Sequence, residues 1–144
     1  MLVRELKLSG FKSYEAARFQ FEGRIVAFTG RNGSGKTNLL DALHHLSLGR
    51  SAFHKQDALN IRHESAFYRL DARLSGVDHE HRLELVYSPE EKKKLSWDGS
   101  VVERISDHVG WRVHARAATI ARRCGAITTR AARSSSSDWS GMRG

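Results

Sequence analysis

The sequence has few of the features that mark secreted or membrane proteins. Cys124 is the one cysteine among 144 residues, so no internal disulfide can form, and a reducing cytoplasm is the expected compartment. No apolar run approaches the roughly 18 residues that span a bilayer, and the N-terminus lacks the apolar core of a signal peptide. With 40% hydrophobic and 28% charged residues, the chain has the composition of one soluble domain, and we expect no membrane partner.

The most informative motif spans residues 30–37 and matches the phosphate-binding loop pattern G-x-x-x-x-G-K-[ST] without a break. The eight residues are Gly30, Arg31, Asn32, Gly33, Ser34, Gly35, Lys36 and Thr37. Upstream, the apolar run 25–28 predicts a buried strand. Downstream, apolar residues recur at helical spacing from Leu39 to Leu46, and Gly49 is suited to end that helix. This order favours a nucleotide site over a glycine-rich turn that happens to contain Lys-Thr.

The chemistry of this loop assigns roles to its residues. Gly30, Gly33 and Gly35 allow positive φ angles and a close approach of the backbone to a phosphate. The loop N–H groups and the positive end of the following helix would then hold the anion. Lys36 would reach the β- and γ-phosphates, and the hydroxyl of Thr37 would be a Mg²⁺ ligand. We therefore predict that residues 30–37 bind a nucleotide, with Thr37 as the metal-binding residue.

Alternating apolar residues predict several strands around the motif. The predicted strands cover residues 2–8, 19–21, 68–74 and 81–87. Asp98-Gly99 is a strong hairpin signal between residues 95–97 and 101–102. The fold class is therefore α/β, with a phosphate-binding loop unit followed by an antiparallel β portion.

Most of the net charge of +8 comes from the C-terminal part of the chain. Residues 1–110 hold 17 Lys and Arg against 15 Asp and Glu, whereas residues 111–144 hold seven Arg and one acid. The latter segment is rich in Ala, Arg and Ser and shows no strand alternation. Three interpretations are open: a GC-rich gene read out of frame, a basic disordered arm that contacts nucleic acid, or an ordered element. We expect a domain boundary at Gly110.

Several segments together carry a family resemblance. The opening reads Leu6-Lys7-Leu8-Ser9-Gly10-Phe11-Lys12-Ser13-Tyr14, and Asn38-Leu39-Leu40-Asp41-Ala42-Leu43 follows the loop. Further segments are Leu48-Gly49-Arg50-Ser51, Asn60-Ile61-Arg62-His63 and Ile105-Ser106-Asp107-His108-Val109-Gly110. The opening restricts the loop to SMC-like heads, and the later segments favour RecF among them. Residues 1–110 thus resemble the N-terminal part of the RecF family, bacterial ATPases of recombination and replication repair.

The resemblance implies a P-loop NTPase fold of the ABC/SMC-head type, of which residues 1–110 would be the N-terminal lobe. It implies an ATP-dependent DNA-binding protein of DNA replication and recombinational repair, active in single-strand gap repair and the SOS response. The implied cofactors are ATP and Mg²⁺. The implied partners are single-stranded, gapped or double-stranded DNA, a second copy in an ATP-dependent homodimer, and recombination mediator proteins.

Hydrolysis is weak in this family, and it needs a Walker B acid, a catalytic carboxylate and a signature motif that residues 1–110 do not contain. We therefore expect a truncated chain that cannot hydrolyse ATP alone. The alternative function is a small stand-alone nucleotide-binding module or a small-molecule kinase. The antiparallel strands that directly follow the loop helix argue against a kinase.

Other polar residues allow more than one interpretation. Lys12 would touch a phosphate or lie in water. Arg62 and His63 would line the nucleotide site or a DNA-facing surface, or have a purely structural role. Residues 92–94, three lysines after two glutamates, predict a solvated turn.

The histidines predict no metal centre. His44 and His45 lie on the loop helix, where one is expected to face solvent and the other to pack. His79 and His81 flank a hairpin. Because no grouping of His and Cys has metal-ligand spacing, we expect no zinc site.

Overall fold

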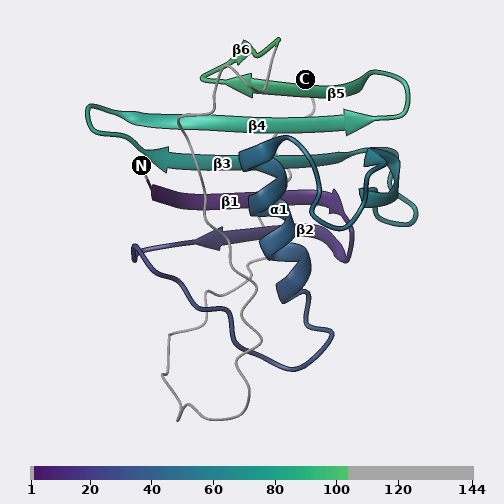
Figure 1. Cartoon of the computed structure of the whole chain (residues 1–144), viewed down its shortest axis with the longest axis horizontal. Helices are drawn as coiled ribbons and strands as arrows, with labels where there is room; N and C mark the ends of the chain where they lie inside the picture. The colour runs from purple at the N-terminus through teal and green to yellow at the C-terminus, as the bar shows by residue number, and fades with distance from the viewer. Residues whose placement is uncertain (1, 104–144) are drawn as a thin grey trace.

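A six-stranded antiparallel sheet is the main feature of residues 2–103, the part of the chain that the computed structural model describes (Figure 1). The strands lie in the order β2-β1-β3-β4-β5-β6. Their bounds are β1 Leu2–Phe11, β2 Tyr14–Gln20, β3 Tyr68–Ser75, β4 Glu80–Ser88, β5 Lys92–Trp97 and β6 Ser100–Val101. The helix α1, Lys36–Leu48, lies across one face of the sheet, and the short 3₁₀ helix η1, Asp57–Asn60, follows it. The predicted boundary at Gly110 and the segment 111–144 lie outside the described residues.

Period-two alternation builds the apolar face that α1 covers. Leu8, Leu70, Leu85 and Leu95 form one row of directly paired residues from β1 to β5, and each is at most 5% exposed. The buried apolar residues of α1 are Leu39, Ala42, Leu43 and Leu46. Burial of each leucine contributes about 1.5–3 kcal/mol, so the helix is fixed mainly by its apolar stripe.

The opposite face of the sheet carries paired charges. Arg82 donates to Asp71, which is 8% exposed, and Arg69 forms an ion pair of 2.8 Å with Glu84. The buried Glu5 contacts Arg73, 3.3 Å away. Because opposite charges alternate between neighbouring strands, this face needs no apolar cover.

The structure confirms most predicted elements. The strands at residues 2–8, 68–74 and 81–87 are present as β1, β3 and β4, and the helix ends at Gly49, which has a φ of 67°. The N–H of Gly49 donates to the carbonyl oxygen of His45 over 2.7 Å. The hairpin at Asp98-Gly99 joins β5 and β6, with both turn residues at positive φ.

Two predicted elements are wrong. Residues 25–28 form no strand, and Ile25 is 93% exposed. A fully buried strand needs partners at both edges, and no strand within residues 2–103 pairs with this segment. In Figure 1 the chain between β2 and α1 instead runs out beyond the β2 edge of the sheet. Residues 92–94 are not a turn but the first half of β5, where Lys93 pairs with Tyr87 of β4.

Candidate nucleotide-binding site

The backbone of residues 30–37 has the conformation that the motif predicts. Gly30, Gly33 and Gly35 have φ angles of 151°, 82° and 86°, which other residues rarely adopt. Gly35 is the N-cap of α1 and has no side chain to occupy the first N–H groups of the helix. The helix therefore presents free donors and its positive end at the loop, which is the arrangement that binds an anion.

The side chain of Lys36 is folded into the loop. Its ammonium group donates to the carbonyl oxygens of Gly30 and Arg31, over 2.9 and 2.7 Å, and to the hydroxyl of Ser34 over 3.2 Å. These three acceptors match the three donors of an ammonium group. The loop thus curves around the cation, in the position from which it would meet the anionic oxygens of a phosphate.

The turn between β1 and β2 docks on the same end of α1. The hydroxyl of Tyr14 donates to the carbonyl oxygen of Gly35 over 3.1 Å, and the amide of Asn38 donates to the hydroxyl of Ser13 over 2.8 Å. A Cβ at Gly35 would lie 2.7 Å from the Tyr14 oxygen. This close contact and the positive φ both require glycine at position 35. The opening motif of the sequence therefore supports the loop directly.

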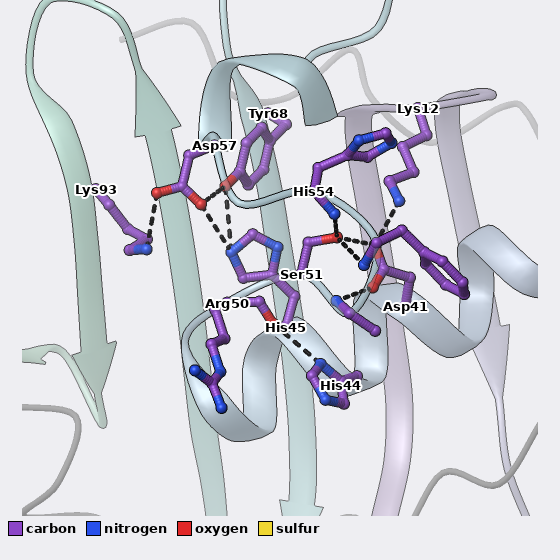
Figure 2. A network of polar contacts seen from close by, with 12 residues as sticks. Lys12, Asp41, His44, His45, Arg50, Ser51, His54, Asp57, Tyr68 and Lys93 are labelled. Atoms are coloured by element: carbon purple, nitrogen blue, oxygen red, sulfur yellow. Dashed lines mark hydrogen bonds and ion pairs between the residues drawn. The ribbon is translucent and has the colours of Figure 1, made fainter.

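Asp41 connects this turn to the chain that follows the helix (Figure 2). Its carboxylate accepts from the ammonium group of Lys12, from the hydroxyl of Ser51 over 2.7 Å and from the N–H of Ala52 over 2.7 Å. Burial raises the pKa of this carboxyl, but the bonds from Lys12, Ser51 and Ala52 outweigh burial and hold the pKa below its ordinary value. The carboxylate is thus a fixed anion inside the fold.

A second polar cluster lies at the other end of α1 (Figure 2). His45 is fully buried, with its Nε2 atom 3.3 Å from the hydroxyl of Tyr68 and 3.4 Å from Asp57. Asp57 also accepts from Lys93 over 2.8 Å. Burial lowers the pKa of His45 to about 4, so the ring is neutral at pH 7. Burial likewise raises the pKa of Tyr68 well above its ordinary value.

The remaining predicted loop residues are at the surface. Arg31, Asn32, Ser34 and Thr37 are exposed, with Thr37 in the first turn of α1. Ser34 also closes the loop, since its N–H donates to the carbonyl oxygen of Arg31 over 3.2 Å. All eight predicted residues therefore lie together around the start of the helix.

The structure also places the two histidines of α1 and the polar residues that allowed more than one interpretation. His44 is partly exposed while His45 packs, as expected. Lys12 does not lie in water: its side chain is 10% exposed and bonded to Asp41. Arg62 is 3.6 Å from Glu15, and its N–H donates to Gly10, whereas the side chain of His63 is 97% exposed.

Sequence reasoning missed the partners that join these segments. Asp41 and Ser51 lie in segments that carry the family resemblance, but the sequence predicts no role for them or for Asp57. A buried acid requires a partner, but at about 100° per residue Asp41 lies away from the apolar stripe of α1, so helical spacing did not mark it as buried. Which cation would serve as that partner could not be read from spacing.

A glycine-rich loop that leads into a helix above a sheet defines the class of phosphate-binding-loop proteins. The sequence matches the family described as "RecF/RecN/SMC N terminal domain" over residues 2–101, and the chain belongs to this family. The described part of the chain contains no helix with the length and hydropathy needed to cross a membrane.

Similar proteins agree with this assignment. The "DNA replication and repair protein RecF" of Flavobacterium johnsoniae is 36% identical over 111 residues, which are 77% of this chain and 31% of that protein. The protein of the same name from Porphyromonas gingivalis is 38% identical over 115 residues, which are 76% of this chain and 30% of that protein. The chain thus spans about a third of the length of these relatives.

Solved structures share the fold. A structure described as "recombination mediator protein RecF-ATP in RecFOR pathway" has a TM-score of 0.69 at 21% identity and covers 75% of this chain and 30% of that one. A structure from work on "ATP-driven dimerization and DNA stimulated activation of SMC ATPases" has a TM-score of 0.67 at 22% identity, with 76% of both chains covered. The architecture is therefore that of the N-terminal part of an SMC/RecF head.

Proposed function

We propose that residues 30–37 bind ATP together with Mg²⁺. The observation that carries this proposal is the loop itself, with three glycines at positive φ and the ammonium of Lys36 held at its centre. The N–H groups of the loop and of the first turn of α1 would hold the phosphate oxygens. Lys36 would exchange its contacts with the loop carbonyls for stronger, charge-assisted contacts with the β- and γ-phosphates.

Thr37 is proposed as the Mg²⁺ ligand from the protein. It lies in the first turn of α1, directly after Lys36, and its side chain is at the surface. Mg²⁺ takes oxygen ligands and usually shares them between protein, phosphates and water. A single hydroxyl at this position, with two phosphate oxygens, is consistent with such a site.

We further propose that the chain supplies the nucleotide-binding lobe of a RecF-like, ATP-dependent DNA-binding protein of DNA replication and recombinational repair. Family membership and the names of the relatives support this role. The proposed partners are a second copy of the head, which ATP would bring together, DNA, and recombination mediator proteins. In this scheme ATP acts as a ligand that favours the closed pair over the open one.

The effect of Thr37 on ATP binding distinguishes a site for ATP with Mg²⁺ from a site that binds anions alone. Binding of ATP to the 144-residue protein would be measured by calorimetry with and without Mg²⁺, for the parent and for Thr37→Val. Valine keeps the shape of threonine but removes the oxygen, so we expect weaker binding in Mg²⁺ and unchanged binding without it. Thr29→Val, at an exposed residue just before the loop, is the matched control. Equal affinities of parent and Thr37→Val in Mg²⁺ would refute the metal assignment.

A further inference from the structure

Three potential metal ligands meet at one end of the sheet, away from the loop. His79 lies in the turn before β4, and His81 is the second residue of that strand. Asp98 lies in the turn between β5 and β6. The ligand atoms of these three side chains all lie within 4.8 Å of one another. The start of β4 and the β5–β6 turn thus bring two imidazoles and a carboxylate together, although His81 and Asp98 are 17 residues apart in sequence.

The positions of Asp98 and His81 are fixed by their surroundings. One Asp98 oxygen accepts from the N–H of Arg82 over 2.7 Å, and the N–H of Asp98 donates to the carbonyl oxygen of Arg82 over 2.8 Å. The other oxygen lies 2.7 Å from Nδ1 of His81, whose ring packs at 5.0 Å from Trp97. Nδ1 of His81 and this oxygen therefore lie side by side, within reach of one ion.

The surroundings of the two imidazoles also suit a cation. The rings of His79 and His81 lie with their centroids 4.2 Å apart. A Cβ at Gly76 would come within 3.0 Å of Nε2 of His81, so that nitrogen packs against the glycine and Nδ1 is the one that faces Asp98. Both histidines lie at or near the surface, where an ion can reach them.

We propose that His79, His81 and Asp98 bind a divalent transition-metal ion, for which zinc fits the ligands best. Two imidazoles and one carboxylate are a common zinc set, with a fourth position for water. Because Zn–N and Zn–O bonds are about 2.0–2.2 Å long, ligand atoms in a tetrahedral site are about 3.3 Å apart. Nδ1 of His81 and the Asp98 oxygen, now 2.7 Å apart, would therefore separate slightly to admit the ion. The ion would tie the β3–β4 turn to the β5–β6 turn and so fasten the edge of the sheet. The spacing of His and Cys predicted no zinc site, because the third ligand is an acid from the neighbouring hairpin.

Metal binding would be tested by titrating the full-length protein with Zn²⁺ in a calorimeter and with Co²⁺ in a visible spectrometer. His79→Ala is the decisive variant, because an exposed residue before β4 can be truncated without loss of a core contact. We expect it to lower Zn²⁺ affinity by more than about tenfold and to remove the Co²⁺ absorption bands of a site with nitrogen ligands. Asp98→Asn keeps an acceptor for Arg82 and tolerates the φ of 49°, and it should also weaken binding.

The matched control is His63→Ala, which removes an equally exposed imidazole at another site. It should bind Zn²⁺ as the parent does. Zn²⁺ should also raise the thermal unfolding midpoint of the parent and not that of His79→Ala, since an ion that binds only the folded state stabilises it. If His79→Ala and the parent bind Zn²⁺ equally, the ion sits on other groups and the proposal is wrong.

The zinc proposal is independent of nucleotide binding. Lys36→Ala should leave Zn²⁺ affinity unchanged, and His79→Ala should leave ATP affinity unchanged.

Discussion

The ammonium of Lys12 is bonded to the carboxylate of Asp41, and this pair joins the β1–β2 turn to the middle of α1. The two side chains are 10% and 0% exposed. The ammonium also lies 5.2 Å from the ring centroid of Phe53. The helix begins at Lys36, about one and a half turns before Asp41, so the pair helps to fix the end of α1 that carries the loop at residues 30–37.

Removal of one member of this pair should destabilise the fold strongly. Asp41→Ala would leave a nearly buried ammonium without its partner, and Ser51 and Ala52 would each lose an acceptor. We expect a loss of about 3 kcal/mol in the free energy of unfolding, measured by urea titration. Lys12→Met with Asp41→Ala should cost less than the sum of the single changes. The control is Lys94→Ala, which breaks an exposed pair with Glu91 and should change stability little. If Asp41→Ala and Lys94→Ala lowered the free energy of unfolding equally, the Lys12–Asp41 pair would not be buried.

Gly33 and Gly35 offer a test of how the β1–β2 turn supports the loop. Their φ angles are 82° and 86°, so alanine meets similar backbone strain at both, about 1–2 kcal/mol. Only at Gly35 would the new Cβ meet another group, the hydroxyl of Tyr14 at 2.7 Å. Gly35→Ala should therefore be the more destabilising, by urea unfolding, and Tyr14→Phe should relieve little because the ring carbon lies at 3.0 Å. Equal losses at the two glycines would mean that Tyr14 does not pack there.

His45 should make stability depend on pH. Its pKa is about 4 in the folded protein, against about 6.5 when exposed, so the unfolded chain takes up the proton first. Stability is then complete above about pH 6.5 and falls as pH is lowered toward 4, by on the order of 2–3 kcal/mol. His45→Gln should flatten this part of the profile of unfolding free energy against pH. His44→Gln, at the neighbouring and partly exposed residue, should leave the slope in place. If His44→Gln removed the slope and His45→Gln did not, the pH dependence would not come from His45.

Local patterns were enough to predict much of this fold. The alternation in residues 68–74 and 81–87, the Asp98-Gly99 turn and the Gly49 helix end all depend on near neighbours, and each is present. The conformation of the loop was also predictable, because its glycines report local φ requirements. The strand predicted at residues 25–28 is absent because a buried strand needs neighbouring strands to pair with, and apolar character alone does not supply them.

The polar contacts could not be predicted for a related reason. Lys12 and Asp41 are 29 residues apart, and Lys93 and Asp57 are 36 apart, so sheet order and register decide that they meet. The grouping of Asp98 with two histidines likewise depends on the pairing of β4 with β5. Residue spacing in the sequence carries no information about such pairings.

The affinity of Lys36 variants for ATP tests the nucleotide site most directly. ATP binding to the parent, Lys36→Ala and Lys36→Met would be measured by calorimetry in Mg²⁺, with Lys55→Ala as a control at an exposed lysine beyond α1. Circular dichroism and urea unfolding would verify that each variant is folded. Loss of the charge-assisted contact to the triphosphate should lower affinity at least about tenfold in both Lys36 variants and leave Lys55→Ala unchanged. Folded Lys36 variants that bind ATP as tightly as the parent would contradict the assignment of residues 30–37 as the nucleotide site.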